Sequence, residues 1–375
     1  MGVLSPHSKL GRLRVVSFSV LPCETAGSLL RREARATPPS GGNISMPPAK
    51  GSLRKFYPLI GAVVLFLGVI VLAVGYSSER RFIQLLTNMD AKWICAAVGL
   101  QVTTYLDSAL AWRVALSSQG KRVPLLEFVQ LGLAKLFTDQ AVPLGGVSGA
   151  LLMVHALGNR GVERAVCLGI FLLVMVSYYT GYALMVGAAL IVLFVAGDMN
   201  DLLLGMAVAF GAVAIIVPGV VFWIRRHPGH KLPKFVTRLP GVPLLLQALG
   251  EASSDLIRNR RLFITVSLLQ ASVIILDGLT LWIMLKALGL HLGIPQAFAS
   301  FVMASVVATL TISPGGLGSF EGGCVAMLHI FGVPLDAGLT ATLLLRGFTF
   351  WLPMLPGMWF AHREMGWRRT HGHKT

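Results

Sequence analysis

Two charged residues lie in apolar stretches near the C-terminal end of the sequence. Glu321 falls within SPGGLGSFEGG (residues 313–323), and Arg346 is the only Lys or Arg between positions 287 and 362. A charge in apolar surroundings needs a partner or a polar cavity. Glu321 therefore either accepts a proton or contacts a ligand head group, or it caps the next short helix, whose N-terminus favours an anion. Arg346 is the natural partner for Glu321 or for a phosphate, and the alternative is a purely structural ion pair.

Four further charged residues occupy apolar segments. Asp107 and Asp277 are candidates for a proton relay, or they bond a neighbouring backbone group or the region of a nearby Trp. Lys135 and Asp139 are four residues apart on one helical face, which favours a self-neutralising pair. That pair is also a candidate to line a polar path.

The sequence contains no catalytic or metal-binding signature. GxSxG, HExxH and P-loop motifs are absent, and the four cysteines are isolated, without His at metal spacing. We therefore expect neither an enzyme nor a bound cofactor or metal.

Composition points to a membrane protein. Hydrophobic residues make up 55% of the 375 residues and charged residues only 13%, against about 25% in ordinary soluble domains. The net charge of +16 is concentrated in flanks of apolar segments, around 9–55, 225–261 and 363–374. Basic flanks of this kind set membrane topology and meet anionic lipid, so nucleic acid is not an expected partner.

Hydropathy predicts an all-α integral membrane protein with six spanning helices and two re-entrant hairpins. The predicted spans are Tyr57–Tyr76, Lys92–Leu116, Phe171–Ala196, Leu202–Trp223, Phe263–Leu285 and Ala337–Phe360. The predicted hairpin arms are Leu125–Val142 with Ala150–Leu157, and Ala297–Ile312 with Cys324–Phe331. Each second arm is too short to span. Broken backbone at membrane depth is tolerated only beside protein or a water-filled cavity.

An internal repeat relates the two parts of the chain. LDSALAW (106–112) and LDGLTLW (276–282) share LD and W at an offset of 170, and VPLGGVSG aligns with SPGGLGSF. The halves, 92–196 and 263–361, have the same span–hairpin–span order, and the predicted topology runs them in opposite directions. Inverted repeats with broken helices are typical of transporters.

Charge predicts cytoplasmic N- and C-termini, although Arg80 and Arg81 then fall outside. We expect residues 1–45 to be a disordered extension or an overextended start before Met46. The membrane domain is expected over 46–362, with a cytoplasmic basic loop at 225–262 and a basic tail at 363–375.

The pattern of P-x-G-G at 143–146, PGGLG-x-x-E at 314–321 and R-x-x-x-x-x-x-P at 346–353 resembles the flippase-like family named for the transmembrane region of lysylphosphatidylglycerol synthases. The resemblance covers about 55–362 and implies a multi-pass protein of the bacterial inner membrane. In the bifunctional synthases this region moves an aminoacylated lipid between leaflets, and a separate soluble domain makes that lipid. Here no such domain follows, so synthase activity is not implied.

The resemblance carries functional expectations to individual residues. It applies best to the second break and Arg346, and less well to the first break. In the family an acidic residue often follows the first break; here that residue is absent, and Asp139 or Asp107 would have to substitute for it. The residues are Pro314, Gly315, Gly316, Gly318, Glu321 and Arg346, then Pro143, Gly145 and Gly146.

Two functions are expected from these features. The preferred one is movement of a lipid or lipid-linked precursor, anionic by the basic character of the chain, between leaflets. Phospholipid, aminoacyl lipid, hopanoid and polyprenyl-linked sugar all fit. The alternative is a non-transporting scaffold that holds a lipid-modifying enzyme or glycosyltransferase, with 225–238 as the docking loop. A small-ion or solute transporter is less well supported, because no dense acidic or hydroxyl cluster is present.

Overall fold

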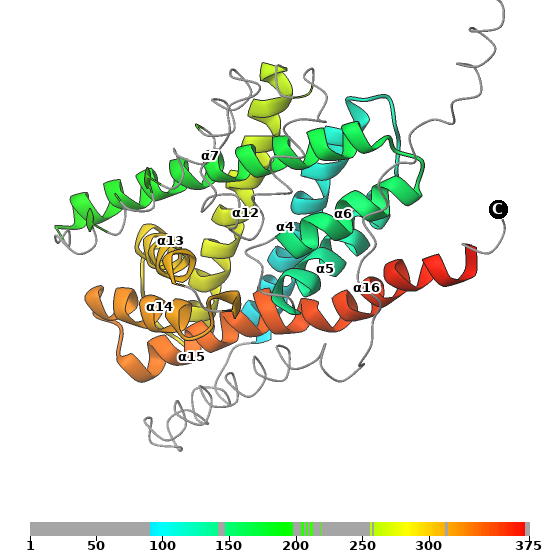
Figure 1. Ribbon diagram of the computed structural model, residues 1–375. Helices are drawn as coiled ribbons and strands as arrows, with labels where there is room; N and C mark the ends of the chain where they lie inside the picture. Colours follow the sequence, from blue (N-terminus) through cyan, green and yellow to red (C-terminus); the bar gives the residue numbers. More distant parts are fainter. Residues whose placement is uncertain are drawn as a thin grey trace, which may run out of the picture. The chain divides into compact units, whose positions relative to one another are not determined.

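The structure, a computed structural model, describes residues 91–141, 147–197, 259–311 and 314–371, with a few isolated positions between 204 and 256. All of them belong to one unit of the chain, Leu53–Thr375. They form helices and connecting turns, without a strand among them (Figure 1). The predicted span Tyr57–Tyr76, most of Leu202–Trp223 and of the basic loop, and the extension 1–45 lie outside the described residues.

The described helices fall into two series with the same order of long and short members. The first series is α4 (Ala91–Ser117), α5 (Leu125–Ala141), α6 (Val147–Asn159) and α7 (Arg164–Ala196). The second is α12 (Arg260–Ala287), α13 (Ile294–Leu310), the 3₁₀ turn η1 (Pro314–Gly316), α14 (Ser319–Ile330), α15 (Leu335–Arg346), the π-helical turn η2 (Gly347–Trp351) and α16 (Leu352–His371). Corresponding helices start 169, 169, 172 and 171 residues apart (Ala91/Arg260, Leu125/Ile294, Val147/Ser319, Arg164/Leu335). The offset of 170 predicted from two short motifs therefore matches the start of each of these four helix pairs to within two residues.

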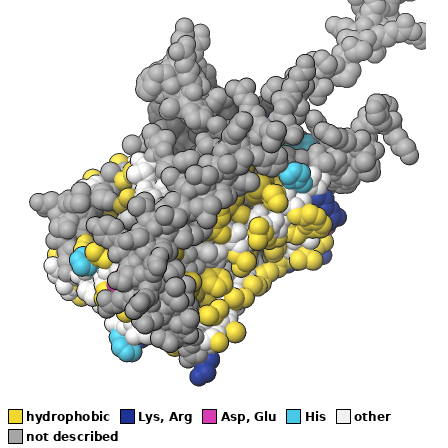
Figure 2. Space-filling view, turned by 90° about the horizontal axis from the view of Figure 1, so that it is seen from below, with side chains coloured by type: hydrophobic (Ala, Val, Ile, Leu, Met, Phe, Trp, Pro, Cys, Tyr) yellow, Lys and Arg dark blue, Asp and Glu magenta, His cyan; other side chains and the backbone are white. Residues whose placement is uncertain are grey.

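Four described segments are long and apolar enough to cross a membrane, and they correspond to four of the six predicted spans. They are Ala91–Ser117, Arg164–Ala196, Arg260–Ala287 and Leu335–Glu364. The third of these segments begins at Arg164, seven residues before the predicted start Phe171, and the additional residues of the helix, RAVCLGI, are apolar apart from Arg164. One face of the described part is mostly apolar, with Lys and Arg near its ends (Figure 2).

The two predicted breaks are present, and each short helix folds back on its predecessor. In the first hairpin, Asp139 contacts Gly149 while Glu127 contacts Arg160. In the second, Thr311 bonds Ser319, and a Cβ on Gly323 would meet Val307. In both cases the residue number falls along the first arm as it rises along the second, which indicates antiparallel arms. Helices of 13 and 12 residues measure roughly 18–20 Å, too short for a hydrocarbon core of about 30 Å.

The helices α4 and α12, which contain the two similar LD–W motifs, run antiparallel. Trp93 stacks edge-on against Trp282, with ring centroids 5.9 Å apart. Further along α4, Gln101 bonds Asp277 and then Asp107 bonds Ser272. Because the partner number decreases from 282 to 272 as the α4 number increases, α4 and α12 point in opposite directions (Figure 1).

The last predicted span is not a regular helix. The Leu352 N–H donates to the Gly347 carbonyl, five residues back, which is the π-helical spacing. The next residue, Pro353, has no N–H and its ring would clash with a carbonyl four residues earlier. The wide turn at Gly347–Trp351 accommodates this proline, whereas Pro356 lies inside α16.

Close packing of α7 on α12 yields a stability prediction. A Cβ on Gly181 would lie 2.9 Å from the Ser267 carbonyl oxygen and 3.1 Å from the Ala271 nitrogen, so the helix backbones would have to separate. We expect Gly181→Ala to lower the free energy of unfolding by about 1–3 kcal/mol. Thermal unfolding of the purified protein in detergent measures this change. Gly99→Ala, where a Cβ meets nothing within 4 Å, is the control and should be neutral or slightly stabilising. Equal effects of the two variants would contradict the packing explanation.

Candidate functional site

The second break places Glu321 at the start of α14 and Arg346 at the end of α15. Gly315, Gly316 and Gly318 have φ values of +63°, +66° and +82°, a region that side chains other than glycine rarely adopt. These three glycines let the chain turn within the few residues between α13 and α14. Glu321 consequently lies in the first turn of α14, where a carboxylate is favoured by the free N–H groups.

Glu321 and Arg346 form a buried ion pair. Their side chains are 4% and 10% exposed, and Arg346 Nε donates to Glu321 Oε1 at 2.7 Å. The other carboxylate oxygen, Oε2, accepts a 2.6 Å bond from the Gly318 N–H. Glu321 therefore both caps α14 and pairs with Arg346, and its role as a proton acceptor or head-group ligand stays a prediction.

The Arg346 guanidinium is also held by the broken backbone and by aromatic rings. Arg346 Nη2 donates to the Gly315 carbonyl at 2.9 Å. Its Cζ atom lies 4.5 Å from the centre of the Phe320 ring and 4.9 Å from that of Phe350. Aromatic faces attract a cation most strongly where water is excluded. The break thus fixes a positive charge between two rings, one from α14 and one from η2.

The first break has its own carboxylate, supplied from the other side of the gap. Asp139 Oδ1 accepts from the Gly149 N–H at 2.7 Å and from the Ser148 hydroxyl at 3.2 Å, at the start of α6. Asp139 Oδ2 accepts from Lys135 Nζ at 2.8 Å. Asp139 thus supplies the acid that the second arm lacks. In each hairpin, a carboxylate accepts a hydrogen bond from a backbone N–H at the N-terminal end of the second arm, and the same carboxylate forms an ion pair with a cation.

The end of α5, beside the first break, lies against the second break. A Cβ on Gly315 would lie 2.4 Å from the amide oxygen of Gln140, the neighbour of Asp139. A small core cluster contains Phe137, Leu152, Leu317, Phe350 and Met354, and so joins both hairpins to the last helix. The candidate site therefore extends from Lys135 through the contact of Gln140 with Gly315 to Arg346.

Asp107 and Asp277 lie in the contact between α4 and α12. Asp107 accepts from the Ser272 hydroxyl, and Asp277 accepts from Gln101 Nε2 at 3.4 Å. Among the described residues, neither acid forms a hydrogen bond or ion pair with Glu321 or Arg346. A connection runs instead through Tyr105 of α4, whose hydroxyl donates to the Phe348 carbonyl of η2 at 2.9 Å.

Of the four remaining predicted site residues, the structure describes one. Pro314 begins η1. Pro143, Gly145 and Gly146 lie outside the described residues. Three participants were missed by the sequence analysis: Gln140, Phe320 and Phe350. Phe350 follows Arg346 by four residues, one helical turn, and that spacing was the available signal. Within the described ranges no group of three or more His, Cys, Asp or Glu is arranged to hold a metal ion.

The buried ion pair makes a prediction about stability. Removing one partner leaves the other charge buried, which typically costs about 3–5 kcal/mol, whereas replacing both with apolar residues of similar size costs much less. We therefore expect Glu321→Leu and Arg346→Met each to lower the unfolding temperature in detergent more than the double variant does. Additive losses would show that the two side chains are not energetically coupled.

Gly315 and Gly318 offer a matched pair at the second break. Both have positive φ, but only at Gly315 does an added Cβ meet other atoms, at 2.4 Å from Gln140 and 2.7 Å from Phe350. Gly315→Ala should therefore be more destabilising than Gly318→Ala, and Gln140→Ala should recover part of the loss in the double variant. Thermal unfolding of the four proteins checks this order. The contact between the breaks would be disproved if Gln140→Ala recovered nothing.

The sequence comparisons agree with this arrangement. Residues 59–357 match the family described as the lysylphosphatidylglycerol synthase TM region, and no curated protein matches the chain. The matched range includes both breaks together with Glu321 and Arg346. Its apolar helices agree with a multi-pass membrane protein and its family with a lipid-related role. The chain belongs to the lysylphosphatidylglycerol synthase transmembrane family.

Proposed function

We propose that this protein moves a lipid with an anionic head group between the two leaflets of the bacterial inner membrane. The observation that carries the proposal is the Glu321–Arg346 pair, buried beside broken backbone at the meeting point of two hairpins. The proposal assigns no covalent chemistry to the chain and requires no cofactor.

A buried ion pair adds little to the free energy of unfolding relative to apolar residues of similar size, because desolvation of both charges offsets much of their attraction. Arg346 uses Nε for Glu321 and Nη2 for Gly315, and among the described residues nothing accepts a bond from Nη1. A phosphate can bind two guanidinium nitrogens at once. In the proposed cycle the head-group phosphate displaces Glu321 from Arg346, and the return of Glu321 releases it.

An inverted repeat supplies the motion in this proposal. Its support is the register of the two helix series and the antiparallel crossing of α4 and α12, which a two-fold axis in the membrane plane would produce. Rocking of one half against the other around a fixed midplane site is the usual mechanism in such folds. The acyl chains would stay in the lipid phase while the head group passes the two breaks.

A reconstituted translocation assay tests the proposal. The full chain is placed in vesicles containing a head-group-labelled anionic phospholipid, and dithionite reports the leaflet of the label. We expect protein-dependent exchange that falls at least tenfold in Arg346→Gln and in Glu321→Gln. Arg346→Lys should recover little, because an ammonium cannot reproduce the bidentate contact.

Arg113→Gln is the matched control, because Arg113 is an exposed arginine of α4 away from the breaks. It should translocate at the unmodified rate. Exchange that survives Arg346→Gln in folded protein would refute the proposed role of the pair. Absence of exchange for every lipid class, together with co-purification of a stoichiometric enzyme, would instead support a membrane scaffold for a lipid-modifying enzyme or glycosyltransferase.

A further inference from the structure

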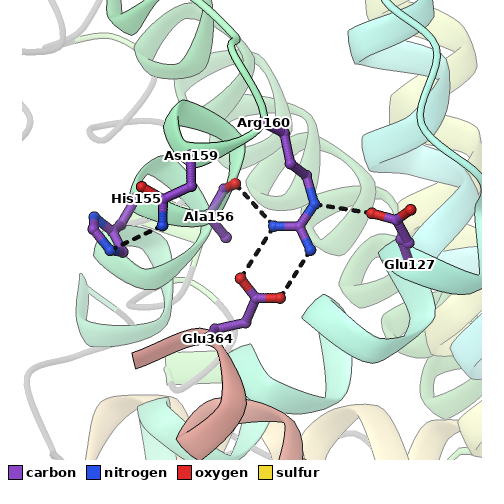
Figure 3. Close-up of polar contacts among 6 residues, drawn as sticks. All are labelled: Glu127, His155, Ala156, Asn159, Arg160 and Glu364. Carbon is purple, nitrogen blue, oxygen red and sulfur yellow. Dashed lines mark hydrogen bonds and ion pairs between the residues drawn. The ribbon is translucent and has the colours of Figure 1, made fainter. Parts of the chain in front are cut away.

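A second charged cluster lies at the other end of the first hairpin, away from the breaks. Arg160 follows α6 and donates from Nε to Glu127 Oε2 at 2.9 Å. It donates from Nη2 to Glu364 Oε1 at 2.8 Å and from Nη1 to Glu364 Oε2 at 3.1 Å, and Nη1 also bonds the Ala156 carbonyl (Figure 3). One guanidinium thus ties the start of α5 and the end of α6 to α16.

This cluster differs from the other described ion pairs because it joins the two halves of the repeat. Lys135–Asp139 and Arg160–Glu127 lie within the first half, and Glu321–Arg346 lies within the second. Arg160–Glu364 is the only pair among the described residues that crosses between them. Its side chains are 18% and 13% exposed, so salt screens it less than a surface pair.

The repeat shows that the tie has no counterpart at the equivalent positions. With the offset of 170, Arg160 corresponds to Ile330 and Glu364 corresponds to Phe194. Ile330 is 41% exposed and Phe194 is 73% exposed, and neither side chain can form an ion pair. The charged connection between the halves therefore exists in one of the two equivalent places only.

Helix packing shows the same asymmetry. The contact of α16 with α5 corresponds, through the repeat, to the contact of α7 with α13. A Cβ on Gly357 of α16 would lie 2.4 Å from the Leu133 carbonyl oxygen of α5. At the equivalent position of α7, Gly187, a Cβ would meet nothing within 4 Å. At Gly357 the backbone of α16 lies directly against that of α5, whereas at Gly187 the backbone of α7 has no such close neighbour.

We infer that Arg160 and Glu364 form a latch that closes one end of the path and must separate during each transport cycle. This inference rests on the proposed translocation function. In an inverted repeat, the second state of the cycle is the one in which the two halves exchange conformations. The closed α5–α16 interface would then open while the equivalent α7–α13 interface closes. The basic flanks, Lys121, Arg122 and Arg164, place the latch at the cytoplasmic end by the positive-inside rule.

The latch opens by separation of Glu364 from a charged Arg160 and not by loss of a proton. The hydrogen bonds that Arg160 donates to Glu364 raise the pKa of Arg160, so the guanidinium stays charged throughout the physiological range. After separation from Glu364, Arg160 keeps its bond to Glu127 in the same hairpin. The cation is therefore never left without a carboxylate, which lowers the cost of opening.

Cross-linking distinguishes a latch from a static structural tie. In a full chain whose native cysteines are replaced, Arg160→Cys with Glu364→Cys is joined by a short bifunctional thiol reagent. We expect translocation to fall at least tenfold on joining and to return on reductive cleavage, because a latch has to open. The matched control joins Arg160→Cys with Glu127→Cys, within one hairpin, and should keep its rate. Unchanged translocation in the joined 160–364 protein would overturn the inference.

An accessibility measurement keeps the test independent of lipid movement. In a second protein, Gln140→Cys beside the breaks reports how fast a membrane-impermeant maleimide reaches this position from the cytoplasmic side. Glu364→Gln is added to weaken the latch, and Glu163→Gln is added instead as the control. We expect labelling several-fold faster in Glu364→Gln than in Glu163→Gln. If no lipid moves but this difference is found, the latch stands and the translocation proposal fails. Equal labelling of the two variants would overturn the latch.

Discussion

Backbone hydrogen bonding is the constraint on which this structure depends. In hydrocarbon every N–H and C=O needs a partner, so a helix can break at membrane depth only where the protein supplies one. Both hairpins solve this problem in the same way, with a carboxylate that accepts from the N-terminal end of the second arm. A carboxylate in such a place needs a cation, which Lys135 provides in one hairpin and Arg346 in the other. The carboxylates and cations at the centre of the fold are thus a consequence of the two helix breaks.

The two breaks are chemically alike but not equivalent in sequence. In the first hairpin the acid and the cation both come from α5, four residues apart, and the amine of Lys135 is one-third exposed. In the second, the acid belongs to α14 and the cation to α15, both side chains are buried, and the Arg346 guanidinium lies between two aromatic rings. The first pair supports its own hairpin, whereas the second connects separate helices. This difference is why the proposed head-group site is centred on Arg346.

Periodic and compositional features were predictable from the sequence. Apolar length gave four of the described spans, and glycine with proline gave both breaks, because these signals depend on local chemistry. The pairing of Glu321 with Arg346 followed from the scarcity of charge in that region. Gln140 and the Arg160–Glu364 tie were not predictable, because each depends on how distant helices pack, whereas the spacing of four residues between Arg346 and Phe350 was a local signal. Arg160 and Glu364 are 204 residues apart, and nothing local marks them as partners.

The central claim is that Arg346 exchanges Glu321 for a lipid phosphate. Solid-state NMR in lipid bilayers tests it directly, through dephasing of arginine ¹³Cζ signals by lipid ³¹P, with Arg346→Lys subtracted to isolate the Arg346 signal. The account predicts a dephased Arg346 signal in anionic phospholipid. An Arg346 signal that no phosphate-bearing lipid dephases, in protein that translocates lipid, would contradict it.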